Sequence, residues 1–499
     1  MSTILIFTDQ GNHYMRLRTS HIILLTFAFL TMLQTACKKD SILSSGGIVK
    51  FSTDTLKFDT VFTAQGSFTT SLNIYNPQGE KIKISSVRME KGANSPFHLN
   101  VDGFQGNNVT NIEMAAYDSI YVFATVNIDP TNANTPFLVE DRLIVTLNGK
   151  DFYVPFTALG QNAHYIIDSV LQTQTWDTIK PYVIIHNAFV NAGATLTIPA
   201  GCKVYMHQDS KLYVFGTLKV NGTPTDTVVF QGDRLDRAYF GYKGYPGEWG
   251  GIYFDSYSTG NVLNYTTLKN CGNSTSLNGQ AGIPAAIQLA WDSVGGIKPQ
   301  LSLYHTKIYN SIGYGIFSYH GTVHAENCLI HSCGAQALGI FRGGNDTFTN
   351  CTFACYSTYA INHTSDNPTV GILNYLDLDP YTYESGDLNA VLTNCVMWGS
   401  QNDEAYFHSK TGANYNLKLN NCLIKNVDTG TIPSYVDTAY CIMNVEPRFK
   451  DSSTWDFHPT ANSPMIDRGA TISSILDDIE AIHRPQGAGY DIGCYEYKP

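Results

Sequence analysis

The stretch HAENCLIHSCG, residues 324–334, places an asparagine and a cysteine side by side before a short apolar run. The same arrangement returns as TNCTF at 349–353, TNCVM at 393–397 and NNCLI at 420–424. YHTKI at 304–308 aligns with these segments and has threonine in place of the cysteine. The middle positions of the series are therefore Thr306, Cys328, Cys351, Cys395 and Cys422, and they are 22, 23, 44 and 27 residues apart. Because 44 is twice 22, we interpret the longest spacing as two repeats. Periods of this size are typical of a solenoid built from stacked repeats.

A second motif keeps pace with the first and has the pattern of short strands. It recurs as AAIQLA (285–290), YGIFSY (314–319), ALGIF (337–341) and YAINH (359–363). Three such strands fill a repeat and leave no room for a helix, so the sequence predicts a parallel β-helix. We expect it to span residues 161–445 in about a dozen coils. Successive coils then lie about 4.8 Å apart, and equivalent side chains stack in columns.

The asparagine of the motif is expected at a bend between strands. Such a bend needs a left-handed backbone, which asparagine tolerates better than most residues. Its side-chain amide can then bond to the asparagine of the next coil. The pattern resembles the asparagine ladder of the pectate-lyase-like right-handed β-helix family, and this resemblance implies the right-handed form. The expected ladder comprises Asn327, Asn350, Asn394 and Asn421, with Cys328, Cys351, Cys395 and Cys422 beside them.

These cysteines have three interpretations. Thr306 fills the same position one repeat earlier, which favours small inward-facing side chains over metal ligands or disulfide partners. Of the 11 cysteines, those other than Cys37 are even in number, and an oxidising compartment would permit disulfides. No pair of CxxC motifs with zinc-site spacing is present. We expect structural thiols, with one or two disulfides as the alternative.

The composition predicts an all-β protein. Tyr (31), Phe (25) and Gly (42) are abundant in the 499 residues, and long helix-forming runs are missing. Charged residues make up 15%, with a net charge of −11 and no basic cluster beyond the N-terminus. Nucleic acid is therefore excluded as a partner, because phosphate binding needs clustered Lys and Arg.

Residues 48–160 alternate apolar and polar positions in short runs separated by Asn, Gly and Pro. Examples are SLNIYN, KIKISSV, SIYVFATVNI and DRLIVTLNG. Such runs predict antiparallel strands, and about seven of them suit an immunoglobulin-like β-sandwich. The segment has no cysteine and resembles the sandwich modules that bacterial surface proteins use as spacers. A spacer without a ligand is the simpler interpretation.

The N-terminal segment predicts that the protein is located at the cell envelope. Arg16 and Arg18 precede the apolar run IILLTFAFLTML, which is too short for a stable transmembrane helix. The following LQTAC, which ends at Cys37, resembles a bacterial lipobox. The resemblance implies that residues 1–37 are a lipoprotein signal peptide and that Cys37 is lipidated. An ordinary secretory signal is the alternative.

A charged and Ser/Gly-rich linker follows at 38–47, and its charges resemble the surface-export signal of Bacteroidetes lipoproteins. Acyl chains on Cys37 would hold the protein in a membrane, since each buried methylene adds about 0.8 kcal/mol. We therefore expect a lipid-anchored protein of the outer membrane, exposed on its periplasmic or outer surface.

Residues 446–499 contain two short motifs, SPMIDRG at 463–469 and HRPQGAGYDIGCYEY at 483–497. They resemble the terminal segment of many bacterial surface β-helix proteins, in which SPxIDxG precedes R…DIGxYE. The resemblance implies a cap that ends the hydrophobic column. The expected cap residues are Asp467 and Asp491, both buried and available to pair with Arg484.

Aromatic and charged residues gather at 233–249, in DRLDRAYFGYKGYPGEW. The segment resembles the GDR…PGxWGGI block of Bacteroidetes β-helix lipoproteins. Aromatic faces stack on sugar rings, and Arg and Asp bind hydroxyls or carboxylates. A loop that folds back onto the coils would use the same residues for packing. The glycan-contact candidates are Asp233, Arg234, Tyr242, Tyr245 and Trp249.

A second candidate is the acidic stretch LDLDPYTYESGD at 376–387. Carboxylates at such spacing can hold Ca²⁺ through hard oxygen ligands, although the stretch has no DxDxDG loop. A solvated acidic loop is the alternative interpretation. The calcium-ligand candidates are Asp377, Asp379, Glu384 and Asp387, and we expect no other cofactor.

No catalytic set stands out. Tyr319-His320-Gly321, with His324 nearby, faintly resembles the GHG stretch of polygalacturonase-type glycosidases, but the NTD, DD and RIK segments of that family have no counterpart on the coils. A glycosidase needs two carboxylates roughly 5–10 Å apart, and the sequence offers no convincing pair. Lys307 and Arg342 are available as lyase bases, without a visible calcium site beside them.

Together these features predict a non-catalytic surface lipoprotein whose β-helix binds a polysaccharide or another surface ligand. A polysaccharide lyase or glycoside hydrolase of the β-helix type is the first alternative. A structural stalk or an adhesin that binds a protein is the second, and it differs in predicting no affinity for sugar.

Overall fold

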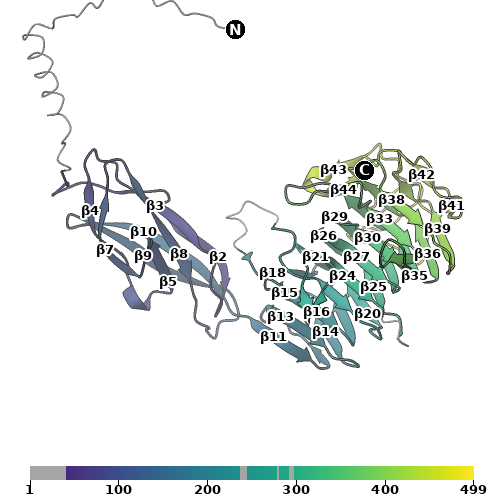
Figure 1. Ribbon diagram of the computed structural model, residues 1–499, viewed down its shortest axis with the longest axis horizontal. Helices are drawn as coiled ribbons and strands as arrows, with labels where there is room; N and C mark the ends of the chain where they lie inside the picture. The colour runs from purple at the N-terminus through teal and green to yellow at the C-terminus, as the bar shows by residue number, and fades with distance from the viewer. Residues whose placement is uncertain (1–40, 236–243, 278–279, 292–296, 499) are drawn as a thin grey trace, which may run out of the picture. The chain divides into compact units, whose positions relative to one another are not determined.

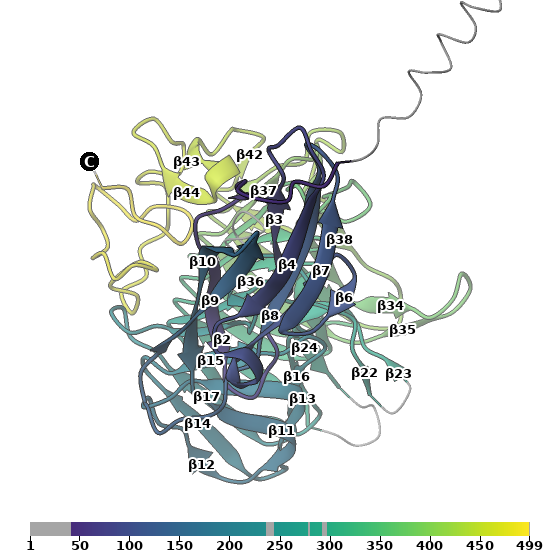
Figure 2. The same ribbon diagram turned by 90° about the vertical axis from the view of Figure 1, so that its left-hand side faces the viewer.

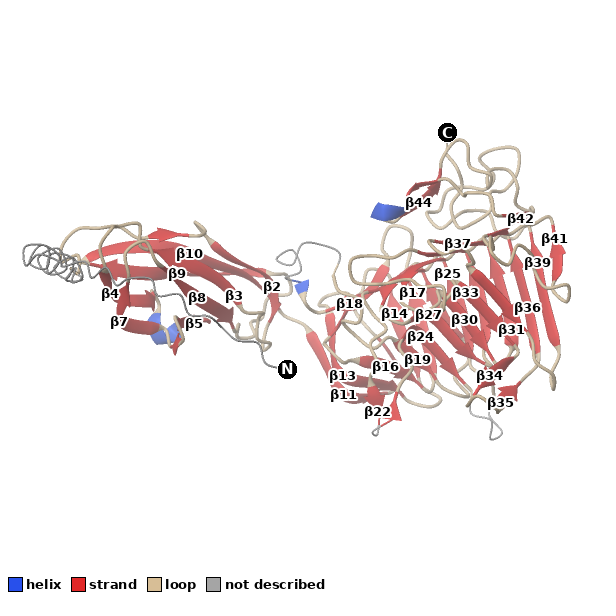
Figure 3. Ribbon diagram, turned by 45° about the horizontal axis from the view of Figure 1, so that its top comes forward, coloured by secondary structure: helices blue, strands red, loops and turns tan. Residues whose placement is uncertain are grey.

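The computed structural model describes residues 41–235, 244–277, 280–291 and 297–498. Strands dominate it, and the helices described are the short 3₁₀ turns η1 (Gly92–Asn94) and η3 (Ser452–Thr454) (Figure 3). The described residues include no helix with the length and apolar character needed to span a membrane. The all-β prediction is thus confirmed.

The chain forms two compact units. The first comprises the residues up to Leu56, Thr69–Ala124 and Asp141–Phe156, and the second comprises Lys57–Phe68, Thr125–Glu140 and the chain from Thr157 on.

The strands before residue 162 form two five-stranded sheets. One contains, in order, β1 (Lys50–Phe51), β3 (Thr70–Tyr75), β8 (Ser119–Val126), β5 (Phe97–Val101) and β6 (Phe104–Gln105). The other contains β2 (Leu56–Phe62), β10 (Lys150–Gln161), β9 (Phe137–Leu147), β4 (Ile82–Met89) and β7 (Asn108–Met114). Antiparallel pairing joins β1 to β3, β3 to β8, and β4 to both β7 and β9. The fully buried rings of Phe97 and Phe156, one from each sheet, meet edge to face at 5.6 Å, so the two sheets share a core.

The second unit stacks parallel strands coil upon coil, as Figure 1 shows from teal to yellow, and presents three faces. The long strands β11 (His164–Leu171) and β13 (Tyr182–Val190) begin it. The hairpin face consists of β16 (Lys211–Val214), β19 (Ile252–Phe254), β24 (Ala285–Ala290), β27 (Tyr314–Tyr319), β30 (Leu338–Phe341), β33 (Val370–Leu373) and β38 (Ala405–His408).

The strap face consists of β15 (Lys203–Met206), β18 (Val228–Gly232), β21 (Thr266–Lys269), β26 (Lys307–Ser311), β29 (Leu329–Cys333), β32 (Thr352–Cys355), β37 (Val396–Gly399), β40 (Leu423–Ile424) and β42 (Ile442–Met443). The amide face consists of β12 (Gln174–Thr175), β14 (Thr195–Pro199), β17 (Thr217–Asn221), β20 (Asn261–Asn264), β25 (Gln300–Tyr304), β28 (Thr322–Glu326), β31 (Gly344–Thr349), β36 (Leu388–Thr393), β39 (Tyr415–Asn420) and β41 (Asp437–Ala439). In the described part of the chain, the ten strands of this face correspond to ten coils, against an expectation of about a dozen.

Inward side chains of successive coils stack into apolar columns. One column on the hairpin face consists of Ile252, Ile287, Ile316, Leu338, Val370 and Ala405. These side chains are buried, and a fully buried Ile or Leu side chain stabilises a fold by about 1.5–3 kcal/mol. The long parallel sheets are consistent with the predicted β-helix solenoid.

The 44-residue spacing is one coil and not two. Thr349 pairs directly with Thr393, and the backbone N–H of Asn350 donates to the Thr393 carbonyl, so the two ladder asparagines lie in adjacent coils. Two insertions account for the extra length: the loop before β33, and a hairpin of β34 (Tyr375–Asp377) and β35 (Tyr383–Ser385). YAINH lies in that loop, and β33 takes the place expected for it, because Val370 pairs with Leu338.

The ladder asparagines sit at the bend between the amide face and the strap face. All four have left-handed backbones, with φ between 49° and 56°: Asn327, Asn350, Asn394 and Asn421. Tyr265, His305 and Tyr440 adopt the same conformation at equivalent bends of neighbouring coils. Only one direct amide-to-amide bond forms in this ladder, from Asn394 to Asn350 at 2.8 Å. The other amides bind the C-terminal segment.

The cysteines beside the ladder point into the solenoid. Cys328, Cys351, Cys395 and Cys422 are fully buried, and Cys441 extends their column by one coil. Thr306 occupies the same column and donates its hydroxyl to the Leu263 carbonyl. All ten cysteines among the described residues are free thiols.

The C-terminal segment forms a strap that runs along the strap face, and it includes the short antiparallel pair β43 (Phe449–Asp451) and β44 (Asp456–Pro459). Asn327 donates to the Asp477 carbonyl at 2.9 Å, and Asn421 donates to the Arg468 carbonyl at 2.8 Å. Apolar strap residues, including Met465 and Ile492, pack on outward side chains of β37 and β40. The segment therefore covers the side of several coils, whereas the expected cap would close the end of the column.

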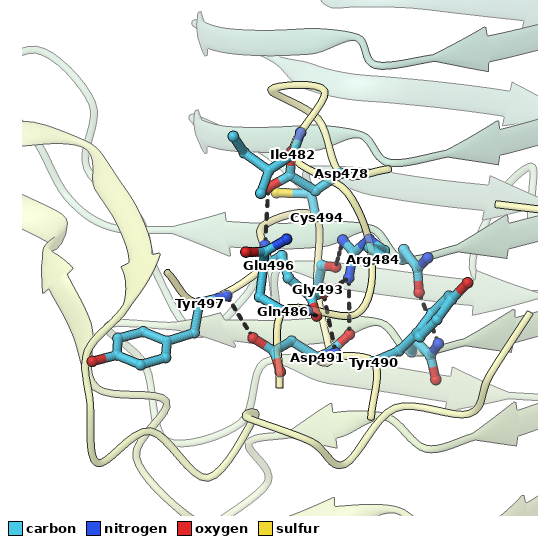
Figure 4. A network of polar contacts seen from close by, with 12 residues as sticks. Asp478, Ile482, Arg484, Gln486, Tyr490, Asp491, Gly493, Cys494, Glu496 and Tyr497 are labelled. Carbon is cyan, nitrogen blue, oxygen red and sulfur yellow. Dashed lines mark hydrogen bonds and ion pairs between the residues drawn. The ribbon is translucent and has the colours of Figure 1, made fainter. Parts of the chain in front are cut away.

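Arg484 anchors the strap through a buried network (Figure 4). Its guanidinium pairs with Glu496 at 2.7 Å and donates to the Gly493 carbonyl at 2.9 Å. The Asp491 carboxylate instead accepts the backbone N–H groups of Asp467 and Tyr497, and Asp467 is exposed. The expected pairing of Arg484 with Asp467 and Asp491 is therefore wrong. Backbone donors already satisfy Asp491, which leaves Glu496 as the counter-ion.

Candidate functional site

The segment at 233–249 is used partly for packing. Trp249 is fully buried: its indole N–H donates to the Lys269 carbonyl at 2.9 Å, and its ring stacks on Phe230. The Asp233 carboxylate is also buried and lies 2.6 Å from Nδ1 of His207. Neither side chain is available to a glycan at the surface, because both are buried.

Two of the remaining candidates, Arg234 and Tyr245, contact different aromatic neighbours, Phe68 and Tyr359. Arg234 is half-buried, and Tyr245 is exposed and contacts Tyr359 edge to face. Tyr242 lies outside the described residues. Cys37, the predicted lipidation site, also lies outside them.

The acidic stretch folds as the β34–β35 hairpin, and its four carboxylates have different partners. Asp379 accepts the backbone N–H groups of Tyr381 and Thr382 at the hairpin tip, and Asp387 accepts that of Asn414. Asp377 pairs with Lys410, and Glu384 pairs with Arg342. Nowhere in the described parts of the chain do three or more His, Cys, Asp or Glu side chains gather as a metal site would require. The structure does not bring the calcium candidates together.

Glu384 instead belongs to a cluster around Arg342 on the hairpin face. The guanidinium lies between two aromatic rings, 5.0 Å from the centroid of Trp291 and 5.2 Å from that of Tyr319. It donates to the Tyr319 hydroxyl at 2.8 Å and lies 3.3 Å from the Glu384 carboxylate. The Tyr319 hydroxyl also contacts Glu384 directly. We call these residues, together with His320, the Arg342 cluster.

Strand register assembles this cluster. Ala290 pairs with Tyr319, and Tyr319 pairs with Phe341, in three successive coils. The residues that follow these positions, Trp291, His320 and Arg342, therefore lie one above another at the same bend. Side chains far apart in the sequence are thus fixed on a rigid β scaffold, and the hairpin adds Glu384 from outside.

The protonation states follow from burial and neighbouring charges. Burial and the hydrogen bond to Glu384 raise the pKa of Tyr319 to about 12, so the phenol keeps its proton. Nδ1 of His320 lies 2.6 Å from the Arg342 carbonyl and must carry the ring proton, which leaves Nε2 as an acceptor. Burial and the charge of Lys298 lower the pKa of His320 to about 4, so the imidazole is neutral at pH 7. Nε of Arg342 is buried and has no hydrogen-bond partner among the described residues.

A second cation lies between rings at the other side of the hairpin. Nζ of Lys410 is 4.2 Å from the ring centroid of Tyr375 and 4.8 Å from that of Tyr383, and it contacts Asp377. The Tyr375 hydroxyl lies 2.9 Å from Nδ1 of His408. We call these five residues the Lys410 cluster.

Exposed tyrosines belong to the Lys410 cluster, contact it or lie on the same hairpin. Tyr383 is 38% exposed, Tyr406 is 45% exposed, and Tyr381 at the hairpin tip is 93% exposed. The ring of Tyr406 stacks almost parallel on His408. The hairpin projects from the same side of the solenoid as a second hairpin, β22 (Ser276–Leu277) and β23 (Gln280–Ala281) (Figures 2 and 3).

This arrangement has the chemistry of a sugar-binding surface. Aromatic rings, hydroxyls and charged groups lie together on the hairpin face. Proteins use such combinations to bind ligands that have both an apolar and a polar side. The carboxylates of both clusters, Glu384 and Asp377, are each paired with a cation. Neither is therefore a free carboxylate of the kind that the paired mechanism of glycosidases needs.

The other residues weighed as catalytic lie elsewhere. Lys307 is on the strap face, where its Nζ lies 3.5 Å from Glu480 of the strap. His324 is on the amide face and pairs with Glu326 at 2.7 Å.

Trp291, Tyr383 and Lys410 are not among the residues singled out from the sequence, and Tyr319 is singled out only as part of the Tyr319-His320-Gly321 stretch. The repeated motif does carry a signal for Trp291 and Tyr319. AAIQLA ends directly before Trp291, YGIFSY ends at Tyr319, and the two motif ends pair in neighbouring coils. Tyr383 and Lys410 carry no such signal. Their contact depends on the inserted hairpin that holds Tyr383, and the length of this insertion follows no repeat.

No protein-family model and no curated protein matches the chain. Among solved structures, it is similar to the catalytic domain of a GH87 α-1,3-glucanase in complex with tetrasaccharides, at 11% identity over 80% of this chain and 92% of that chain, with a TM-score of 0.23. A family 123 glycoside hydrolase from Clostridium perfringens is matched at 8% identity over 22% of this chain and 25% of that chain, with a TM-score of 0.16. The DNA glycosylase AlkC from Pseudomonas fluorescens is matched at 11% identity over 26% and 33%, with a TM-score of 0.14. Scores this low carry no argument about function.

Proposed function

We propose that this chain is a cell-envelope lipoprotein that binds glycan on the hairpin face of a right-handed parallel β-helix. The observation that carries the proposal is the pair of cation–aromatic clusters around Arg342 and Lys410, which one hairpin joins. Both clusters hold polar groups in fixed positions, and exposed tyrosine rings lie beside them. A sugar ring offers an apolar face to such rings and hydroxyls to the neighbouring polar groups.

The remainder of the proposal rests on the sequence. The lipobox that ends at Cys37 supports lipidation and attachment to the outer membrane. The two N-terminal sheets serve as an immunoglobulin-like spacer between the anchor and the β-helix. A protein-binding adhesin would use the same anchor and spacer without affinity for sugar.

A second candidate function is glycan cleavage, and one specific observation favours it. Tyr319 bridges Glu384 and Arg342, and the neutral His320 beside it presents Nε2 as an acceptor. A tyrosine that retains its proton and a neutral histidine are suitable groups for acid and base steps. We place binding first, because a pKa of about 4 makes His320 a weak base.

The test uses the purified full chain with uronate-rich and neutral polysaccharides, with and without Ca²⁺. Retention in affinity gels and the release of new reducing or unsaturated ends are recorded together. We expect retention without new ends, and at least tenfold weaker binding by Tyr383→Ala and Trp291→Ala. Tyr121→Ala, which removes an exposed tyrosine of β8, is the matched control and should bind normally. New ends that disappear in His320→Asn or Glu384→Gln would establish cleavage instead.

A further inference from the structure

The outer surface of the amide face carries a row of three exposed asparagines. Asn345, Asn389 and Asn416 occupy the same position in successive coils of β31, β36 and β39. Asn389 donates its side-chain amide to Asn345 at 3.2 Å, and Asn416 donates to Asn389 at 2.9 Å. This amide row lies near the start of the amide-face strands, whereas the asparagine ladder follows their ends.

The amide row retains unused hydrogen-bonding capacity. Among the described residues, the three side chains make no hydrogen bonds beyond those two. Each amide has two N–H donors and an oxygen with two lone pairs. Asn389, in the middle, therefore still offers one N–H and one lone pair to solvent, and the two end residues offer more. Unused donors and acceptors therefore recur from coil to coil along the row.

A hollow of about 520 Å³ lies over the amide row. Its lining includes the three asparagines together with Thr322, His324, Thr347, Val391 and Lys418. Ligand sites in proteins usually have volumes of roughly 300–1,000 Å³, so the hollow has the size for a short oligomer.

The charged groups around the hollow are paired, except for Asp346, which also lines it. Burial raises the pKa of the Asp346 carboxyl to about 8, so it keeps its proton and is uncharged at pH 7. His324 lies 2.7 Å from Glu326, which raises the pKa of the imidazole and keeps the pair together. Lys418 faces Asp437 at 3.8 Å. No Phe, Tyr or Trp among the described residues lines the hollow. An ionic ligand would find no unpaired counter-charge there, whereas a neutral ligand with many hydroxyls would meet the unused amide groups.

We infer that the amide row is a binding site for a neutral oligosaccharide extended along the solenoid axis. Each sugar hydroxyl both donates and accepts, which matches the pair of functions that Asn389 leaves open. Coils repeat about every 4.8 Å, close to the length that one sugar unit adds to an extended chain, so successive units meet successive asparagines. The site lies on the amide face, whereas the Arg342 and Lys410 clusters lie on the hairpin face. The inference therefore does not depend on the proposed function.

The test is calorimetric titration of the full chain with neutral hexasaccharides of glucose, mannose and xylose, and with hexagalacturonate as the charged contrast. We expect at least one neutral probe to bind. Asn389→Ala should weaken that binding at least tenfold, and Asn389→Asp should weaken it as well, because aspartate loses the donor and adds charge. Asn108→Ala, an exposed asparagine of β7, should bind like the unmodified chain. Circular dichroism verifies that each variant is folded.

Tyr383→Ala separates the two sites. If neutral binding survives in Tyr383→Ala and is lost in Asn389→Ala, the amide row is the site. Loss in Tyr383→Ala together with normal binding by Asn389→Ala would overturn this inference and leave the proposed function in place. Failure of every neutral probe to bind the unmodified chain, or binding of hexagalacturonate alone, would also overturn it.

Discussion

Asn394 donates a hydrogen bond to the side-chain oxygen of Asn350, 2.8 Å away in the preceding coil. The same amide also donates to the Ala470 carbonyl at 2.9 Å, and its oxygen accepts the Ala470 N–H at 2.7 Å. One side chain thus joins two coils and the strap. The asparagine ladder of this protein is therefore a joint between the solenoid and its C-terminal segment as well as a link between coils.

Replacing Asn394 should destabilise the fold measurably. Asn394→Ala removes three buried hydrogen bonds and places alanine at a left-handed backbone, for an expected loss of about 2–4 kcal/mol in the free energy of unfolding. Asn394→Gly removes the same bonds but suits the backbone, so it should lose less. Urea denaturation of both variants measures the difference. Equal stability of Asn394→Ala and the unmodified chain would contradict the role given to this joint.

The Arg484–Glu496 pair offers a test of the strap by a double-mutant cycle. Removing one partner of a buried ion pair typically costs 3–5 kcal/mol, since the other charge stays buried and unpaired, and Arg484→Met should therefore lose about that much. Burial raises the pKa of Glu496, and the positive charge of Arg484 acts in the opposite direction. The double variant Arg484→Met/Glu496→Gln should recover part of the loss. Additive losses in the unfolding free energies would show that the two groups do not interact.

Asp346 should make stability depend on pH. Its side chain is buried, and its Oδ2 has no hydrogen-bond partner among the described residues. Burial raises its pKa to about 8, against about 3.9 for an unfolded aspartate. Between these values the folded chain keeps a proton that the unfolded chain releases, so this contribution to stability is complete below about pH 4 and is lost as the pH rises toward 8.

The variant Asp346→Asn removes this dependence. It should melt at a higher temperature than the unmodified chain at pH 8 and at nearly the same temperature at pH 4. Thermal unfolding followed by circular dichroism across this range provides the comparison. Parallel profiles for the two proteins would show that the Asp346 carboxyl titrates normally.

The thiols should be inert in the folded protein. Burial raises the pKa of Cys202 and of Cys494 to about 12, and nine of the ten described cysteines are buried. A thiol reagent should therefore react first with the half-buried Cys441 and with the remainder only after unfolding. Denatured protein without reductant should titrate ten thiols if Cys37 carries a lipid, and 11 if it does not. A smaller number would demonstrate disulfides.

The repeat could be predicted from the sequence because it depends on local chemistry. A left-handed bend restricts the residue to a few types, and the adjacent inward position requires a small side chain, so Asn327-Cys328 and its equivalents recur visibly. The spacing of 44 residues was misinterpreted for a physical reason. Strand pairing fixes which positions stack, but it places no limit on a loop that leaves the coil and returns, and two such insertions together equalled one period.

The candidate site depends on contacts that no local pattern records. The sequence pattern of Trp249 suits a surface aromatic, but the side chain belongs to the apolar core of the solenoid, where it stacks on Phe230. Arg342 lies between Trp291 and Tyr319 because three coils are in register, and Glu384 reaches it only through the inserted hairpin. The sequence likewise offers Arg484 three carboxylates, those of Asp467, Asp491 and Glu496. Backbone N–H groups, which a sequence does not show, occupy the Asp491 carboxylate, and Arg484 pairs with Glu496.

Affinity electrophoresis of the purified full chain through gels that contain single polysaccharides tests the central claim most directly. We expect at least one polysaccharide to retard the chain through the hairpin face, so that in its gel Tyr383→Ala migrates freely while Tyr121→Ala and Asn389→Ala are still retarded. Free migration of the unmodified chain in every gel would contradict glycan binding and leave an adhesin or a stalk as the function.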